Sequence, residues 1–423
     1  SYLEADSFKL GHGFSDGKAR PTDTRNRRDN AFRTDQKGSF KLGFTPNETD
    51  EYALGYSKQE GEKGNPVYAG KNTNESSRYW QWPTWDKESI YFLSTTALDE
   101  HNSIKLRAYQ DKYENALKMF KDSNYRELDE YSPYDDKTYG AAVEWVNSYF
   151  DQHELHVAVH HKDDRHNDGL KKYRDVTQSI ALEDMITLTD TWRLRLGASH
   201  EEREARKVYM YDKGTTRATN GLLEIIHDLN DNVEVFASVA KKTRLPTLKD
   251  RYSARLGRAL PNPDLKSEVA RHAELGVRGT PWANAYAEAT VFYSGMRDEI
   301  QTATTAVLTC GKKGKDACDQ AQNIGKTRHR GVELSLEQTL GEQWRLGGAY
   351  TYLKRDNLSD SSVKLTDTPT HKLFAHASWS PIARLELQVN LEAEKGRSIG
   401  YREKKGTPDS YPTLSGFAVA GFK

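Results

Sequence analysis

The sequence has almost no cysteine, no excess of charge of either sign and no long hydrophobic run. No apolar stretch approaches the roughly 18 residues of a transmembrane helix, so helical membrane spans are excluded. The 62 basic and 62 acidic residues balance and are spread along the chain, so no basic patch points to a nucleic-acid partner. The chain starts at Ser1 without a charged and apolar leader; a secreted protein would have had one removed.

The two cysteines, Cys310 and Cys318, lie close together in a polar stretch rich in Gly and Lys. This spacing predicts a disulfide that closes a small loop in an oxidising compartment. Two free thiols are the alternative. A zinc site is disfavoured, because no second pair of ligands would complete four-coordination.

Helical periodicity is also scarce. Nothing sustains a period of 3.6 residues over a dozen positions, and only residues 114–121 could form a turn or two of helix inside a long loop. A parallel sheet is therefore disfavoured, because its crossover connections are usually helices.

The chain is polar but rich in aromatic residues. Its mean hydropathy is −0.87 and its hydrophobic content 36%, yet it contains 23 Tyr and 8 Trp. Disordered chains lack aromatic residues, so disorder is disfavoured. A polar chain with many Tyr and Trp is typical of a β-barrel that has a wet interior and a thin apolar band outside.

Strict alternation of apolar and polar residues dominates several segments. Residues 385–393 carry Leu, Val and Ala at odd positions and charged or amide residues at even ones. Residues 192–198, 233–239 and 285–293 alternate in a similar way. A period of two puts one set of side chains on each face of a strand. These segments therefore predict strands with one apolar and one polar face.

The connections alternate between short and long. Short polar turns such as residues 45–50, 99–102 and 340–343 are separated by long polar stretches such as 116–139 and 162–175. This alternation is typical of an antiparallel up-and-down transmembrane β-barrel with tight periplasmic turns and longer outside loops. We count about 18–19 strands, most of them as long as the ~9–11 residues that cross a membrane. Whether the barrel closes stays open.

Four tryptophans lie close to short connections, and several share the face of the apolar row beside them. Such rings predict an aromatic girdle at one membrane interface. Ordinary cross-strand packing is the alternative for any single one. The four residues are Trp192, Trp282, Trp344 and Trp379.

Aromatic and basic residues also crowd the end of one long loop. Exposed aromatic rings with Arg and Lys would meet an anionic or aromatic ligand by stacking and by charge. Alternatively, some of these residues form an upper girdle. The candidate ligand-binding residues are Lys63, Tyr68, Arg78, Tyr79, Trp80 and Trp82.

No catalytic or metal-binding motif stands out. The histidines His156, His160, His161 and His166 are close in sequence, but we expect them to form hydrogen bonds in the barrel interior or at its rim. No pair of nucleophile and base, phosphate-binding loop or calcium-loop spacing is evident. We therefore expect no enzymatic activity, no metal and no cofactor.

Five segments together resemble the central barrel of TonB-dependent outer-membrane receptors. Two short motifs are particularly similar to the family. One is Asn-Pro-Asp-Leu before an expected strand that begins with Ser-Glu, and the other is Gly-Val-Glu-Leu after a long loop. The resemblance covers nearly the whole chain. The segments are residues 241–253, 262–279, 291–301, 323–340 and 368–381, and residues 41–61 also resemble the family.

The resemblance implies a receptor in the bacterial outer membrane with a barrel of about 22 strands around a plug domain. Its partners would be outer-membrane lipid, the TonB energy-coupling complex and a scarce nutrient such as a ferric siderophore, haem or cobalamin. Residues 1–423 would form the barrel domain, with the plug, the energy-coupling segment and the last strands absent.

The outer face contains a weak apolar row at Ala285, Ala287 and Ala289. This row leaves open an alternative: a redesigned, more soluble barrel, or a surface β-protein that binds without transport.

Overall fold

The computed structural model describes five segments of the chain. Side chains are described in all of them except at residues 304–310, 316, 317 and 413–422. The segments are residues 1–6, 28–66, 78–310, 316–397 and 413–422.

The chain divides into two compact units. Unit 1 comprises Ser1–Asn147, His156–Ile180 and Glu201–Thr215. Unit 2 comprises Ser148–Leu155, Ala181–His200 and Thr216–Lys423.

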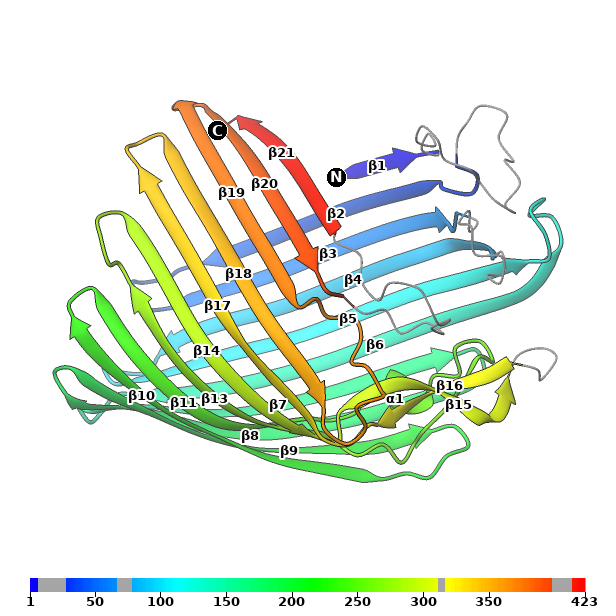
Figure 1. Ribbon diagram of the computed structural model, residues 1–423, viewed down its shortest axis with the longest axis horizontal. Helices are drawn as coiled ribbons and strands as arrows, with labels where there is room; N and C mark the ends of the chain where they lie inside the picture. The colour runs from blue at the N-terminus through cyan, green and yellow to red at the C-terminus, as the bar shows by residue number, and fades with distance from the viewer. Residues whose placement is uncertain (7–27, 67–77, 311–315, 398–412, 423) are drawn as a thin grey trace. The chain divides into compact units, whose positions relative to one another are not determined.

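Antiparallel strands that pair in chain order make up almost the whole described structure. Among the described residues, 18 strands belong to one large sheet. In unit 1, each strand from the first to the sixth pairs with the next one along the chain, and Figure 1 shows these strands side by side. They are β1 (Tyr2–Ala5), β2 (Arg33–Phe44), β3 (Glu51–Gly64), β4 (Tyr79–Ala97), β5 (Asn102–Phe120) and β6 (Leu128–Asn147).

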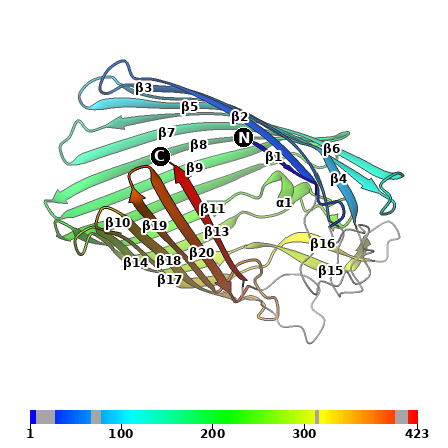
Figure 2. The same cartoon turned by 90° about the horizontal axis from the view of Figure 1, so that it is seen from above.

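Four strands have residues in both units: β7 (His153–Asp168), β8 (Lys171–Thr189), β9 (Trp192–Val208) and β10 (Thr215–Asn230). Unit 2 continues the same meander from β10 onward (Figure 2). Its further strands are β11 (Val233–Arg244), β13 (Glu268–Gly279), β14 (Ala285–Arg297), β17 (Thr327–Leu340), β18 (Trp344–Asn357), β19 (His371–Ile382), β20 (Leu385–Lys395) and β21 (Thr413–Phe422). The prediction of an all-β, antiparallel, up-and-down architecture is confirmed.

A second, small sheet and one short helix lie in the long connections of unit 2. The sheet contains β12 (Ala259–Leu260), β15 (Ile300–Cys310) and β16 (Asp316–Asn323), with β12 parallel to β16. The helix α1 (Leu248–Tyr252) has five residues and begins with a capping box between Thr247 and Asp250. Within the described segments, no helix is long and apolar enough to span a membrane.

Each unit exposes its apolar side chains on one face of the sheet, which we call the apolar face. In unit 1, cross-strand register aligns Leu42 with Leu54 and Leu54 with Phe92. Leu42 is 58% exposed and Phe44 63%, whereas Ala53 on the opposite, polar face is 7% exposed. A water-soluble protein buries most of its large apolar side chains, whereas this sheet exposes them. A large exposed apolar surface indicates contact with a membrane or a partner.

Unit 2 repeats the arrangement with a continuous row across five strands. Ala237 pairs with Leu275, Leu275 with Val291, Val291 with Val332, and Val332 with Tyr352. Because side chains alternate along each strand, Glu274, Thr290 and Glu333 fall on the polar face. The predicted separation of apolar and polar faces is therefore present in both units.

Several strands are longer than the sequence patterns predicted. The stretch at 116–139 was expected to be a loop, with helical turns possible at 114–121. Instead β5 continues to Phe120 and β6 starts at Leu128. The loop expected at 162–175 is also wrong, because β7 reaches Asp168 and β8 starts at Lys171.

These strand extensions show no apolar alternation, because residues 162–168 are mostly polar whereas Ala116, Leu117 and Met119 are apolar and buried on both faces of β5. Backbone pairing and cross-strand polar contacts stabilise them instead. Arg174 Nη2 lies 2.7 Å from Asp163 Oδ2, and Thr138 Oγ1 donates to Asp164 Oδ1 at 2.7 Å. Opposed polar and charged pairs of this kind stabilise neighbouring strands without an alternating apolar face.

Candidate functional site

In unit 1, four aromatic rings form a continuous line of edge-to-face contacts on the polar face. Trp80 contacts Trp82 at 6.2 Å between ring centroids, Trp82 contacts Trp85 at 6.0 Å, and Trp85 contacts Tyr113 at 5.5 Å. The interplanar angles of 82°, 85° and 77° are those of favourable T-shaped pairs. With Lys63, these residues form what we call the aromatic–cation cluster.

A break in strand register brings two of these rings to the same face. Trp82 and Trp85 are three positions apart, so regular alternation would put them on opposite faces. The register of β4 against β5 shifts between Gln81 and Thr84. Pro83 lies at this point and cannot donate a ladder hydrogen bond, which is why proline is confined to bulges and edges.

Basic side chains cover the rings of the cluster. Lys63 Nζ lies 3.3 Å from the ring centroid of Trp85 and 5.1 Å from that of Trp82. Arg78 Cζ lies 4.9 Å from the centroid of Trp80. Each contact is a cation–π interaction, worth about 0.5–2 kcal/mol depending on desolvation. All of these side chains are half-buried, so each keeps some surface in contact with solvent.

Asn30 fixes the strand ends that carry the cluster. Its side chain is 8% exposed, and its Nδ2 donates to the carbonyl oxygens of Asn65 and Trp80 at 2.8 Å each. Its Oδ1 accepts from Gln81 Nε2 at 3.0 Å. The amide therefore ties the ends of β3 and β4 together beside Lys63 and Trp80.

The structure brings together four of the six residues predicted to bind ligand: Lys63, Arg78, Trp80 and Trp82. The fifth, Tyr79, contacts Tyr125 edge-to-face at 6.0 Å and is not part of the line. The sixth, Tyr68, lies outside the described residues. An upper girdle would require the rings on the apolar face, whereas the line of rings lies on the polar one.

Unit 2 contains a buried polar network that the sequence did not predict, centred on Glu299. Glu299 is 7% exposed and directly precedes β15. Arg355 Nη2 donates to its Oε1 at 2.8 Å, and His329 Nε2 lies 3.2 Å from its Oε2. The buried hydroxyl of Thr327 also donates to Oε2. One carboxylate therefore joins the starts of β15 and β17 to the end of β18.

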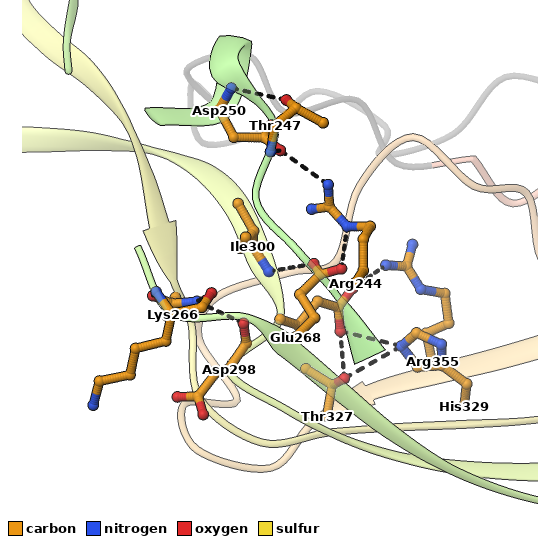
Figure 3. Close-up of polar contacts among 12 residues, drawn as sticks. Arg244, Thr247, Asp250, Lys266, Glu268, Asp298, Ile300, Thr327, His329 and Arg355 are labelled. Carbon is orange, nitrogen blue, oxygen red and sulfur yellow. Dashed lines mark hydrogen bonds and ion pairs between the residues drawn. The ribbon is translucent and has the colours of Figure 1, made fainter. Parts of the chain in front are cut away.

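A second carboxylate extends the network toward α1 (Figure 3). Glu268 Oε1 accepts from the backbone N–H of Ile300 at 2.6 Å, and its Oε2 accepts from Arg244 Nε. Arg244 Nη1 also donates to Asp250 Oδ2 at 2.9 Å. Asp250 in turn accepts from the backbone N–H of Thr247 at 3.0 Å. The network thus connects the helix, β13 and the hairpin of β15 and β16.

Both loop carboxylates of this network are held ionised. Burial alone would raise the pKa of Glu299, but hydrogen bonds from His329 and Thr327 and the charge of Arg355 outweigh it and lower the pKa to about 2. Burial likewise opposes the charge of Asp250, and the Thr247 N–H and the Arg244 guanidinium lower its pKa. The network is therefore charged and paired at neutral pH.

Three of the predicted girdle tryptophans, Trp192, Trp344 and Trp379, lie at or near the turn ends of their strands in unit 2, and Trp282 lies in the short connection between β13 and β14. Trp344 and Trp379 are directly opposed across β18 and β19 and stack at 5.4 Å. Trp192 stacks on His227 at 4.1 Å, and Trp282 Nε1 donates to Gln338 Oε1 at 2.6 Å. Trp344 and Trp379 share the face of the Leu346–Ala377 pair, which is the apolar face. Contact of these rings with a membrane interface stays a prediction.

Cys318 is fully buried and disulfide-bonded. The side chain of Cys310 lies outside the described residues, so the Cys310–Cys318 pairing stays a prediction.

Three of the four clustered histidines, His156, His161 and His166, contact carboxylate or amide side chains. His156 Nδ1 lies 2.7 Å from Glu144 Oε1, and His166 Nδ1 lies 2.5 Å from Asp136 Oδ1. Within the described part of the chain, no group of three or more His, Cys, Asp or Glu residues could hold a metal ion.

An antiparallel meander with an exposed apolar face and a polar face defines the class of outer-membrane β-barrel proteins. The family model described as "TonB dependent receptor-like, beta-barrel" matches residues 3–422, so the chain belongs to this family. Members of this family are transporters rather than enzymes. No curated protein sequence matches the chain.

Solved structures with the same fold include two transporters and a siderophore receptor. The copper transporter OprC has a TM-score of 0.71 at 16% identity, covering 99% of this chain and 67% of its own. The FrpB iron transporter from Neisseria meningitidis (F3-3 variant) has a TM-score of 0.72 at 14% identity, covering 99% and 68%. The siderophore receptor PirA from Acinetobacter baumannii has a TM-score of 0.65 at 16% identity, covering 93% and 64%.

Proposed function

We propose that the chain is the barrel domain, residues 1–423, of a receptor in the bacterial outer membrane. The receptor would bind a scarce nutrient such as a ferric siderophore and import it with energy from the TonB complex. Haem, cobalamin and copper are the other cargoes to test. Membership of the TonB-dependent receptor family carries the proposal. Structures of similar fold named as a copper transporter, an iron transporter and a siderophore receptor support it.

The aromatic–cation cluster supports an anionic or aromatic cargo. Its rings offer stacking surface, and Lys63 and Arg78 add two positive charges at the same place. Since the cluster lies on the face opposite to the apolar rows, it would face the water-filled side of the barrel wall. We propose that Lys63, Arg78, Trp80 and Trp82 contact the cargo and that Tyr68 and Tyr79 assist.

In the same proposal, the apolar face contacts outer-membrane lipid. The stacked pair of Trp344 and Trp379, together with Trp192 and Trp282, would lie at the membrane interface on the side of the short turns. Their polar edges would contact headgroups while their ring bodies contact acyl chains.

Titration of the detergent-solubilised protein with ferric siderophores, haem, cobalamin and copper salts tests the cargo. Quenching of tryptophan fluorescence reports binding at the cluster. We expect one cargo class to quench, and the double substitution K63Q/W82L to weaken its binding by about tenfold through lost cation–π and stacking contacts. K58Q is the matched control, because Lys58 lies on β3 but pairs with Glu60 away from the rings. Equal affinity of K63Q/W82L and wild type would remove the cluster from the proposal.

Solubility distinguishes the alternative of a soluble or non-transporting barrel. The weak apolar row at Ala285, Ala287 and Ala289 is the observation that favours this alternative. A lipid-facing barrel needs detergent to stay monodisperse. A chain that remains monomeric in buffer without detergent would support the soluble alternative.

A further inference from the structure

A junction of three chain segments lies beside the aromatic–cation cluster in unit 1, with Asn30 at its centre. Asn30 precedes β2, and its side chain is buried. Its amide nitrogen donates to the carbonyl oxygens at the end of β3 and the start of β4, and its amide oxygen accepts from a side chain of β4. We call this group the Asn30 junction; its members are Asn30, Gly64, Asn65, Trp80 and Gln81.

The backbone is strained at this junction. Asn30 has a φ of 53°, in the left-handed region. Tyr125, in the turn between β5 and β6, has the same φ of 53°, and a bulky residue rarely adopts it. The Tyr125 ring contacts Tyr79, the neighbour of Trp80, edge-to-face at 6.0 Å. Two strained residues therefore contact consecutive positions of β4, and such strain persists mainly where it serves a site.

A glycine makes room for the junction. A Cβ at Gly64 would lie 2.3 Å from the carbonyl oxygen of Asn30 and 2.6 Å from its Oδ1, which is too close for real atoms. The Gly64 N–H also donates to the carbonyl oxygen of Phe32 at 2.9 Å. Since Gly64 directly follows Lys63, a displacement at this contact would move the backbone that carries the Lys63 side chain.

Regular strand pairing does not fix the position of Lys63. β3 pairs with β4 continuously up to Gln59, and pairing resumes only at Lys63 and Gly64. Lys63 Nζ nevertheless lies 3.3 Å from the ring centroid of Trp85. The short paired end of β3 is held in place by Asn30, which bonds both strand ends from the side.

We propose that Asn30 is a positioning residue for ligand binding at the aromatic–cation cluster. It holds the ends of β3 and β4 so that Lys63 lies over the rings of Trp82 and Trp85, and it does not itself contact the ligand. The inference rests on the proposed role of the cluster in cargo binding. A change at Asn30 or at Gly64 should therefore release Lys63 from the rings and weaken the binding of an aromatic anion.

Two variants perturb the junction from different segments. N30D keeps a residue that tolerates the left-handed backbone and keeps an acceptor for Gln81, but it places an oxygen against two carbonyl oxygens. G64A introduces the Cβ that collides with Asn30. Acylation of lysines by a water-soluble succinimidyl ester, followed by peptide mass spectrometry of the detergent-solubilised chain, measures how freely Lys63 leaves the rings. Lys58, also on β3, is the reference within each sample.

Two further variants are matched controls in the same unit. N47D keeps the Asn47 acceptor that binds the N–H groups of Thr49 and Asp50. G38A adds a Cβ with no atom within 4 Å. We expect Lys63 to be acylated about tenfold faster in N30D and G64A, through loss of its cation–π contacts, and at the wild-type rate in both controls. Acylation of Lys58 should be unchanged throughout.

Isothermal titration calorimetry with 4-sulfobenzoate, an aromatic dianion, measures binding. N30D and G64A should bind this probe about tenfold more weakly than wild type, and N47D and G38A equally well. Wild-type acylation of Lys63 in N30D and G64A would overturn the inference. Faster acylation of Lys63 and Lys58 alike would also overturn it, because Asn30 would then only stabilise the fold.

Failure of the proposed function has a different signature. In that case wild type would not bind 4-sulfobenzoate, or K63Q/W82L would bind it as wild type does, whatever the acylation rates of the Asn30 and Gly64 variants. Either result would remove the cluster from cargo binding and the ligand-positioning role of Asn30 with it.

Discussion

Replacing Glu299 with Gln tests whether the buried polar network of unit 2 stabilises the long connections. The substitution keeps the size of the side chain and removes its charge. Glu299 has a pKa lowered from its ordinary 4.5 to about 2, and its side chain is 9% exposed, so solvent screens it little. Because one pKa unit corresponds to about 1.4 kcal/mol, the ionised carboxylate contributes on the order of 3 kcal/mol.

The contribution has a definite pH dependence. A carboxylate whose pKa is lower in the folded protein stabilises that state above the pKa of the unfolded chain, and the stabilisation is lost as pH falls through the folded pKa. The free-energy difference between wild type and E299Q should therefore be full at pH 7. It should shrink between about pH 4.5 and pH 2.

Urea unfolding in detergent micelles, followed by tryptophan fluorescence at pH 7 and at pH 3, measures this difference. The matched control is D298N, because no described residue lies within ion-pair distance of the neighbouring Asp298 carboxylate. A loss of less than about 1 kcal/mol for E299Q at pH 7, or an equal loss for D298N, would refute the reasoning.

Three further predictions concern single features of the fold. A Cβ at Gly140 would lie 2.2 Å from the Tyr109 ring, so G140V should lower the free energy of urea unfolding by about 1–3 kcal/mol. A Cβ at Gly38 would have no atom within 4 Å, so the control G38V should cause no steric loss of stability. T247A removes the capping box of α1 and should cost about 1 kcal/mol, seen as faster proteolysis after Arg251 with unchanged cleavage elsewhere. Under oxidising conditions, C318S should be cleaved by protease in the hairpin of β15 and β16 faster than wild type. Reduced wild type should be cleaved there as fast as C318S.

The architecture could be predicted because it depends on a pattern that every strand repeats. Alternation in residues 385–393 and 233–239 identifies the strands and also assigns their faces, and short turns fix the antiparallel order. The strand extensions at 116–120 and 162–168 could not be found in this way. At 116–120 apolar side chains occur on both faces of the strand, and at 162–168 the side chains are mostly polar, so neither segment alternates. Their pairing partners are not revealed by a single sequence.

Most residues of the candidate site could be predicted from the sequence, but their arrangement in space could not. Arg78, Trp80 and Trp82 are close in sequence, so their proximity was foreseeable. Lys63 reaches Trp85 only because β3 pairs with β4 and because a bulge at Pro83 reverses the alternation.

The Glu299 network escaped prediction for a related reason. Its members come from separate strands, connections and the helix, and no spacing in the sequence links them. Glu268, Glu299 and Arg355 are far apart in the sequence and are brought together by the fold.

The central claim is that one face of each strand contacts lipid while the other contacts water. Single cysteines at Glu274, Leu275 and Val291 test it directly, in a background without free thiols. The protein is reconstituted in vesicles and reacted with a membrane-soluble and a water-soluble maleimide. The account predicts that L275C and V291C react with the membrane-soluble reagent and E274C with the water-soluble one. Preferential reaction of L275C and V291C with the water-soluble reagent would contradict it.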